Sequence, residues 1–578
     1  MKSHHTDSIE ALESRIAPAS LLTVTYDAAT GALTLTDDLA NNATGPAADN
    51  LVSILKTGAS TYRIADAGGT DIGAAGVTFL DIGNVTSLSL LGDEGADTFF
   101  VTGVNALKTF SFAGGAGVDQ LIATDLAVKG AATVDFGANG GSASFEGSSA
   151  SIGGDLTVNF GANGGIVNFS AISTLIKGAV TLNGGLGNDQ FALTNAGNTS
   201  LVGKGIKLVG SDGNDSVTID SRVSALVGKS AVTGNAIEID GGAGSNSLIS
   251  NSAGTVTLKG NVLFTGGNDA DDLSLLSSTL NVDGELRMNG GAGIDTATLG
   301  GAKVSVKKAV TIDMAAGSST VSIGANVVAL GSSLTVKGTT GGDDFSISVN
   351  KLTTGGAVSF ESGAGDDSFS LDAASVLIKG AFTITGGADA DTVTIQADGL
   401  LSGAVTLDLG ASSDGDQAIT LSGRSGLVGN LKLAGTLTVN SDADDGGVGY
   451  TDRFTSTDVT VSKAVLIDLG SADSAVTMDN FSVKDLFTLT TGDGADTVNI
   501  EQNNTFGPSI MSKLVMINLG DGADLINIGV SSVAGSSAFV KFLADLQVNG
   551  GSGINTKNPF ETAGVNVFSV APSAPVGF

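Results

Sequence analysis

The feature that most constrains this chain is a short motif that returns about every 25 residues. It consists of a glycine-rich turn, an Asp, and then a run in which apolar and small polar residues alternate. Clear copies are GGAGVDQL (Gly114–Leu121), GGLGNDQF (Gly184–Phe191), GGAGIDTA (Gly290–Ala297) and TGDGADTVNI (Thr491–Ile500). A period in this range is typical of solenoids and related repeat arrays.

Less regular copies fill the longer gaps between the clear ones. FGANGGSASF (Phe136–Phe145) and FGANGGIVNF (Phe160–Phe169) place Ser142 and Ile166 at the Asp position, and MAAGSSTVSI (Met314–Ile323) places Ser319 there. With these included, the position recurs 21 times, and the 20 steps between copies cover 506 residues, a mean of 25.3. One continuous array is therefore expected, rather than the roughly four domains that the length alone suggests.

Each repeat has the pattern of short strands. Residues 391–410, DTVTIQADGLLSGAVTLDLG, contain β-branched runs separated by Gly, with the period-two alternation of half-buried strands. Three short strands and three turns fit one coil of a right-handed parallel β-helix. The sequence thus predicts an all-β solenoid of about 21 coils, roughly 100 Å long at about 4.8 Å per coil. Phe136, Phe145, Phe160 and Phe169 are expected to stack inside it.

The two ends differ from the repeats. Residues 1–20 carry Asp7 and Glu10 in a capping-box arrangement and Ile9, Leu12 and Ile16 on one helical face, which predicts a short amphipathic helix. The expected division is residues 1–20 as a sorting or capping helix, 21–556 as the β-helix, and 557–578 as a C-terminal strand and tail. No apolar run of about 18 residues is present, so no membrane-spanning helix is expected.

Composition argues against several functions. With 27 Lys and Arg against 59 Asp and Glu, the net charge is −32, which is unfavourable for binding nucleic acid. Without Cys, no disulfide or thiolate metal site can form. His occurs only at positions 4 and 5, and Trp, a common sugar-stacking residue, is absent. We expect no catalytic residues and no enzyme activity.

The repeated Asp is the best candidate for a site. Like charges about 4.8 Å apart are unfavourable unless solvent, hydrogen bonds or cations intervene, and Ca²⁺ takes carboxylate and carbonyl oxygens as ligands. The alternative is that each Asp caps its own turn by accepting backbone N–H groups. The candidate Ca²⁺ ligands are Asp97, Asp119, Asp189, Asp215, Asp269, Asp271, Asp295, Asp344, Asp367, Asp391, Asp416, Asp496 and Asp524.

A second column, of Lys, lies about half a coil before the Asp position. Its members are Lys108, Lys129, Lys177, Lys204, Lys259, Lys307, Lys379, Lys463, Lys484 and Lys513. Half a period places these residues on the opposite edge of the predicted coil. They are expected either to form a solvated stripe or to meet the Asp edge of a neighbouring rod.

Two parts of the chain resemble known families. IEALESRIAPA (residues 9–19) resembles the LEPR-XLL segment at the start of large bacterial surface and secreted repeat proteins, although Glu13-Ser14-Arg15 stands where that family has Glu-Pro-Arg. Residues 45–556 resemble the bacterial beta strand repeat surface proteins. The GGxGxD turns also look like the calcium-binding repeats of RTX proteins, which return every nine residues rather than every 25.

These resemblances imply a bacterial protein that is extracellular or exposed at the cell surface. The expected function is a structural β-solenoid that assembles with itself, head to tail, into a filament, sheath or matrix. Its expected partners are other copies of the chain and cell-surface polysaccharide. The alternatives are a calcium-dependent adhesin and a polysaccharide lyase or hydrolase on the same fold.

Overall fold

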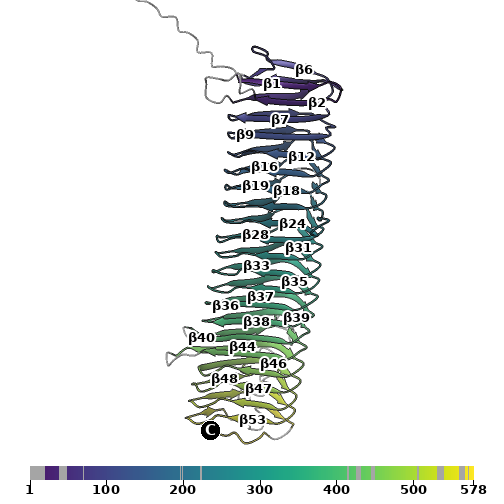
Figure 1. The fold of residues 1–578 in the computed structure, drawn as a ribbon. Coiled ribbons are helices and arrows are strands. Elements are labelled where there is room, and N and C mark those ends of the chain that lie inside the picture. Colours follow the sequence, from purple (N-terminus) through teal and green to yellow (C-terminus); the bar gives the residue numbers. More distant parts are fainter. Residues whose placement is uncertain are drawn as a thin grey trace, which may run out of the picture.

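The computed structural model describes residues 20–37, 49–68, 70–195, 197, 200–221, 224–412, 415–424, 431–443, 449–503, 507–529, 539–558, 566–569 and 572–578. The described residues form a single elongated stack of strands with no helix among them (Figure 1). The predicted helix over residues 1–20 falls almost wholly outside these ranges, and Ser20 begins the first strand. Within the described part of the chain, no segment qualifies as a membrane-spanning helix.

Two long sheets form the walls of the stack, and nearly all their strand pairs are parallel. Sheet A receives one strand from each coil: β1 (Ser20–Asp27), β2 (Ala32–Asp37), β5 (Thr70–Ile72), β7 (Ser87–Glu94), β9 (Thr109–Ala116), β12 (Ala132–Asp135), β15 (Leu156–Asn159), β18 (Val180–Asn183), β21 (Ile206–Val209), β24 (Asn235–Asp240), β27 (Asn261–Thr265), β30 (Leu286–Asn289), β32 (Val310–Asp313), β34 (Leu334–Lys337), β36 (Val358–Ala364), β38 (Phe382–Ala388), β40 (Val405–Ser412), β43 (Leu437–Ala443), β45 (Val465–Asp468), β47 (Phe487–Thr490), β50 (Val515–Asn518) and β53 (Leu546–Asn549).

Sheet B has two limbs, and in most coils each limb receives its own strand. The first limb holds β3 (Leu51–Lys56), β8 (Thr98–Thr102), β10 (Asp119–Thr124), β13 (Gly141–Glu146), β16 (Gly165–Phe169), β19 (Asp189–Leu193), β22 (Ser216–Ile219), β25 (Ser247–Ser250), β28 (Asp272–Leu275), β41 (Ala418–Ser422), β48 (Thr497–Ile500), β51 (Leu525–Ile528) and β54 (Thr556–Lys557). The second limb holds β11 (Ala127–Val128), β14 (Ser149–Ile152), β17 (Ser173–Ile176), β20 (Ser200–Val202), β23 (Ser224–Val227), β26 (Thr255–Leu258), β29 (Thr279–Val282), β42 (Leu431–Leu433), β49 (Ser509–Met511), β52 (Val540–Phe542) and β55 (Val567–Phe568).

In the middle and later coils the two limbs merge into single long strands. These are β31 (Thr296–Val306), β33 (Thr320–Leu330), β35 (Asp344–Thr354), β37 (Ser368–Ile378), β39 (Thr392–Leu401), β44 (Thr451–Val461) and β46 (Asp473–Val483). From β31 to β37 the register advances by 24 residues at every step, since Thr296 pairs with Thr320 and Asp344 pairs with Ser368. Between β37 and β39 the offset changes from 24 to 23 residues after Ala373. The predicted class, an all-β parallel solenoid, is confirmed.

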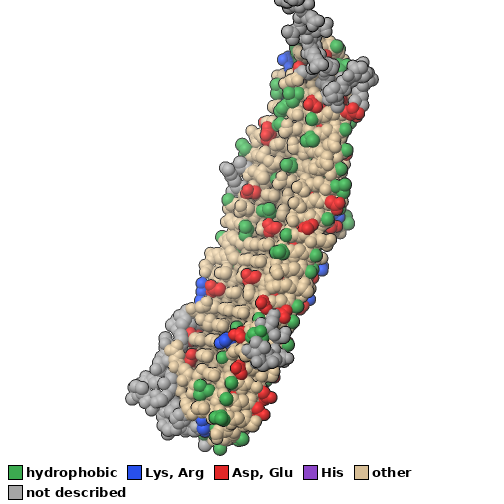
Figure 2. Space-filling view, turned by 90° about the vertical axis from the view of Figure 1, so that its left-hand side faces the viewer, with side chains coloured by type: hydrophobic (Ala, Val, Ile, Leu, Met, Phe, Trp, Pro, Cys, Tyr) green, Lys and Arg blue, Asp and Glu red, His purple; other side chains and the backbone are tan. Residues whose placement is uncertain are grey.

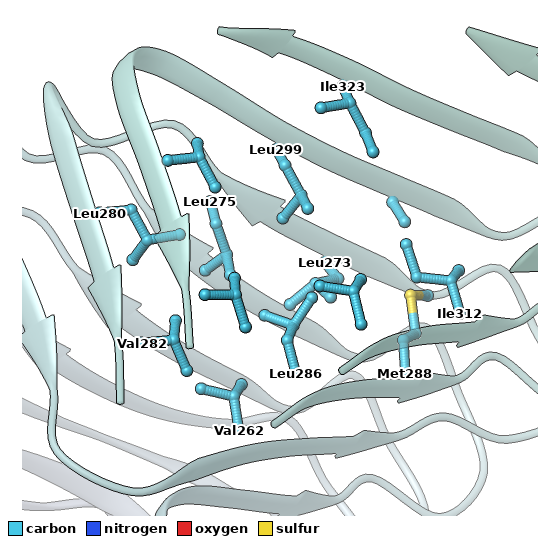
Figure 3. Close-up of a cluster of buried hydrophobic side chains, with 14 of the residues drawn as sticks. Val262, Leu273, Leu275, Leu280, Val282, Leu286, Met288, Leu299, Ile312 and Ile323 are labelled. Atoms are coloured by element: carbon cyan, nitrogen blue, oxygen red, sulfur yellow. The ribbon is translucent and has the colours of Figure 1, made fainter. Parts of the chain in front are cut away.

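Alternation along the strands builds one continuous core. Inward side chains such as Val262, Leu273, Leu286 and Ile312 from successive coils meet in the interior (Figure 3). The predicted Phe stacks are present: the ring centroids of Phe136 and Phe160 are 6.0 Å apart, and those of Phe145 and Phe169 are 4.4 Å apart. Burial of these rows on every coil is the main force that holds the coils together.

The N-terminal end departs from the prediction. The stack has about 18 turns instead of about 21. The first two counted copies, at Asp49 and Asp71, do not begin regular coils, because Asp49 precedes β3, which has an antiparallel partner, and Asp71 lies within β5 of sheet A. β1 pairs antiparallel with β2, and β3 pairs antiparallel with β4 (Tyr62–Asp66), which pairs antiparallel with β6 (Phe79–Ile82). The alternation of apolar and polar residues is the same in parallel and antiparallel strands, so the sequence alone cannot distinguish a hairpin from a coil of the solenoid.

Candidate functional site

The repeated Asp lies where the chain turns from sheet A into the first limb of sheet B. In one coil, β30 ends at Asn289, the turn runs from Gly290, and Asp295 stands immediately before β31. The Asp side chain points into this corner of the solenoid, and Asp295 is 0% exposed. The spacing is regular: in most coils the buried residue lies five residues after the first residue of the turn.

A ladder of hydrogen bonds joins these residues along the rod. At ten of these Asp residues Oδ1 accepts the backbone N–H of the equivalent residue on the preceding coil. Asp189 differs, because its Oδ2 accepts the N–H of Gly185 in its own turn and its Oδ1 has no partner among the described residues. The bonds to Asp119, Asp215, Asp271 and Asp295 measure 2.7–2.9 Å, and the pattern recurs at Asp97, Asp343, Asp367, Asp391, Asp496 and Asp524. Most of these Asp residues therefore tie one coil to the next. The turn-capping alternative is confirmed at Asp189 and Asp271, whose Oδ2 atoms accept the N–H groups of Gly185 and Gly267 in their own turns. We call this column the aspartate ladder.

The glycines of the motif make room for the ladder. A Cβ on Gly290 would lie 2.1 Å from Oδ2 of Asp295, so only Gly fits beside the carboxyl group. Gly291 has a φ of +94°, and a Cβ there would lie 2.0 Å from the carbonyl oxygen of Gly267 on the preceding coil. Positive φ and close backbone approach are both easily tolerated only by Gly. The motif GGxGxD thus encodes a corner that carries a buried carboxyl group.

Ten of the thirteen predicted ligands belong to the ladder and are buried: Asp97, Asp119, Asp189, Asp215, Asp271, Asp295, Asp367, Asp391, Asp496 and Asp524. The other three lie in exposed parts of the turns. Asp269 accepts the N–H of Gly244, Asp344 accepts the hydroxyl of Ser368, and Asp416 forms a 3.0 Å ion pair with Arg453.

Sequence reasoning chose the wrong residue in several coils. The ladder residue beside Asp344 is Asp343, and beside Asp416 it is Gln417, both buried. In the two FGANGG copies the position is occupied by Gly141 and Gly165, not Ser142 and Ile166. Counting five residues from Gly338 would have identified Asp343. Other neutral members are Asn246, Ser319, Ser474 and Asn555.

Burial raises the pKa of the ladder carboxyl groups. It raises the pKa of Asp189, Asp295 and Asp343 to about 6 and that of Asp97, Asp215 and Asp496 to about 7. At Asp391 burial, reinforced by the charges of Asp367, Asp366 and Asp389, raises the pKa to about 8. A backbone hydrogen bond to each carboxyl group opposes the shift without cancelling it.

Exposed Asp residues flank the ladder on the surface of the same turns. Asp366 accepts the N–H of Ala390, and Asp389 accepts the N–H of Gly365, so these side chains also link coils. Acidic side chains are spread along the rod in the space-filling view (Figure 2). Within the described ranges, no three His, Cys, Asp or Glu side chains converge as a metal site would require. Binding of Ca²⁺ remains a prediction.

The Lys column lies on a different turn, the one that leads from sheet B back to sheet A. Lys259 and Lys307 approach Asp283 from the coils on either side, at 3.4 and 2.8 Å. The hydrogen bond from Lys307 lowers the pKa of Asp283, with a smaller contribution from Lys259. These lysines are about half exposed or more, and part of the column is therefore engaged within the same rod.

Comparisons with known proteins give no relative. No family model, no curated protein and no solved structure matches this chain.

Proposed function

We propose that this chain is an extracellular or cell-surface structural rod that assembles end to end into a filament, sheath or matrix. The observation that carries the proposal is the unbroken stack of coils. One hydrophobic core extends from Leu22 to Val548, and parallel strand pairing continues from β7 to β53 along sheet A.

Such a stack resists bending and pulling along its whole length. Each coil bonds to the next through backbone hydrogen bonds in both sheets and through the aspartate ladder. In repeat proteins stability is approximately a sum over neighbouring coils, so no single loop or domain linker is the weak point. A continuous rod suits a load-bearing or spacing role.

The ends supply the surfaces for assembly. At the C-terminal end, β55 pairs with β52, Phe568 stacks on Phe542 with centroids 5.1 Å apart, and Val567 is 49% exposed. No described strand lies on the outer side of β55. Such an edge is a template for strand addition.

The N-terminal end offers a complementary edge at β6, where Phe79 is 53% and Leu80 37% exposed. The segment LLTVTY (residues 21–26) is unsuitable as the receiving edge because β1 is already paired with both β2 and β5. A heterologous contact between β55 of one copy and β6 of the next would not close on itself and would give fibres.

A pocket near the C-terminal end does not favour the lyase or hydrolase alternative. It has a volume of about 350 Å³ and lies between sheet A and the last residues of the chain. Its lining is uncharged: Met516, Asn518, Gln547, Val548, Asn549, Ser573, Ala574 and Val576. Glycoside hydrolysis ordinarily uses a pair of carboxyl groups.

Electron microscopy of the purified full-length chain tests the assembly. Val567→Asp places a charge on the exposed edge of β55 and should abolish fibres while leaving single rods. The matched control is Val232→Asp, because Val232 is 94% exposed and lies on a turn in the middle of the rod. The control should polymerise normally. Fibres that form equally well from the Val567→Asp variant would contradict end-to-end assembly through β55.

A further inference from the structure

At most Asp positions of the ladder, the second carboxyl oxygen has no hydrogen-bond partner among the described residues. The exceptions are Asp189, Asp271 and Asp496, whose Oδ2 atoms accept hydrogen bonds from Gly185, Gly267 and Thr491 of their own turns. Oδ2 of Asp97, Asp215, Asp343 and Asp391 is buried and unpaired, although Oδ1 of each accepts an N–H group. An ionised carboxylate left half-satisfied in an apolar corner is costly. This arrangement repeats over many coils, so it calls for a common physical explanation.

In two coils Oδ2 and a backbone carbonyl oxygen border the same small space, the one that the absent Cβ of a turn glycine leaves free. The space for a Cβ on Gly338 is bordered by Oδ2 of Asp343, at 1.7 Å, and by the carbonyl oxygen of Ser362, at 2.8 Å. The space at Gly210 is likewise bordered by Oδ2 of Asp215 and the carbonyl oxygen of Gly241, at 2.0 and 2.3 Å.

Two acceptors that border one such space repel each other unless a donor stands between them. Among the described residues, no N–H or O–H group donates to the Gly241 carbonyl oxygen. A proton on Oδ2 of Asp215 would supply that donor.

The neutral residues at the ladder position show that a hydrogen-bond donor is needed beside the turn carbonyl oxygen. Nδ2 of Asn555 donates to the carbonyl oxygen of Gly550 at 2.6 Å, and the hydroxyl of Ser474 donates to that of Thr491 at 3.3 Å. Both side chains also stand at the ladder position, and both use a hydrogen to reach a turn carbonyl. A protonated Asp would do the same with its second oxygen.

We propose that the ladder residues whose Oδ2 is unpaired are neutral carboxylic acids, each holding one proton on Oδ2 and donating it to a backbone carbonyl oxygen of the turn. Each of these rungs then accepts an N–H from the preceding coil through Oδ1 and donates an O–H through Oδ2. The ligand of this column is the proton. The cavity beside Asp367 and Asp391 is about 10 Å³, near the smallest volume that holds one water.

The environment of Asp343 makes it the cleanest rung to test. The preceding coil presents the N–H of the neutral Ser319, and the following coil presents Asp367, itself a ladder residue. The neighbouring Asp344 is exposed and outside the ladder. Burial, with a smaller effect from the charge of Asp367, raises the pKa of Asp343 to about 6, so at pH 5 this side chain is protonated in the fold and ionised after unfolding.

The number of protons released on unfolding measures directly how many ladder carboxyl groups are protonated in the folded protein. The full chain is unfolded in guanidinium chloride at pH 5 in a pH-stat, with a chelator present. Wild type should release several protons, and Asp343→Asn should release about one fewer. Asp344→Asn, the adjacent exposed control, should release the same number as wild type.

Two results would overturn the proposal. One is equal proton release from wild type and Asp343→Asn. The other is an Asp343→Asn rod that unfolds at pH 8 as readily as Asp343→Ala, because an amide can replace a neutral acid but a methyl group cannot. In the infrared spectrum at pH 5, the band of protonated carboxyl groups should weaken in Asp343→Asn and persist in Asp344→Asn.

Discussion

At the scale of single residues, the corner of each coil is a fixed volume that two positions share. Where the ladder residue is Asp, the first position of the turn is often Gly. Where the ladder residue is Gly, as at Gly141, the first position is Phe136, whose ring would lie 2.8 Å from a Cβ on Gly141. In the FGANGG copies the same corner is therefore filled by the Phe ring of the first turn position, and not by the carboxyl group of an Asp at the ladder position.

This exchange predicts compensation between two substitutions. Gly290→Phe should destabilise the rod by about 1–3 kcal/mol or more, because the ring would overlap the carboxyl group of Asp295. Combining it with Asp295→Gly should recover part of the loss, with a coupling of about 0.5–3 kcal/mol, as expected for residues in contact. Thermal melting of the two single variants and the double variant measures this coupling. Strictly additive losses would show that the two positions do not share one space.

At the scale of the strand, inward and outward positions should respond very differently to charge. Val498 in β48 is 0% exposed and lies between Val476 and Ile526 of the adjacent coils, whereas Asn499 points outward. Val498→Asp buries an unpaired carboxylate and should cost several kcal/mol. Asn499→Asp should change the melting temperature little. Similar melting of both variants would contradict the register of β48.

Much of the strand pattern and most of the ladder positions could be predicted from the sequence. Alternation in DTVNI places Val498 and Ile500 inside, and the glycine-rich turns locate most of the ladder. Burial of the Asp residues could not be predicted, since carboxyl groups are rarely fully buried and the motif equally suits an exposed calcium turn. The sequence could not show which of the adjacent Asp343 and Asp344 is buried, because a shift of one residue in the strand register exchanges their two environments. The merging of two strands into β31 also leaves no mark in the alternation.

At the scale of the whole molecule, the ladder predicts how stability depends on pH. The pKa values of about 6 to 8 in the fold exceed the roughly 3.9 of an unfolded Asp. Folding therefore favours the protonated form, and this contribution is complete below about pH 4 and is lost as pH rises through 6 to 8. Residues such as Asp283, whose pKa is lowered, act in the opposite direction in acid. The melting temperature should therefore be higher near pH 5 than at pH 8.

A melting series from pH 4 to pH 9, with and without a chelator, checks this dependence. Neutral rungs predict the same curve in both conditions. If calcium occupied the Asp column instead, saturation at about 100 times its Kd would add about 2.7 kcal/mol per site, and chelation would lower the melting temperature at neutral pH. A melting temperature that rises from pH 5 to pH 8 would contradict the ladder in either buffer.

The constant 24-residue register from β31 to β37 also bears on how such a chain can change over generations. Each of these coils meets its neighbours through the same pairs of positions, so a duplicated 24-residue unit would find matching strands above and below it. In-frame duplication or loss of one unit would lengthen or shorten the rod by about 4.8 Å without altering its cross-section. The reach of the molecule is thus a quantity that selection can adjust in equal increments, by copying a stretch of gene and not by redesigning a fold.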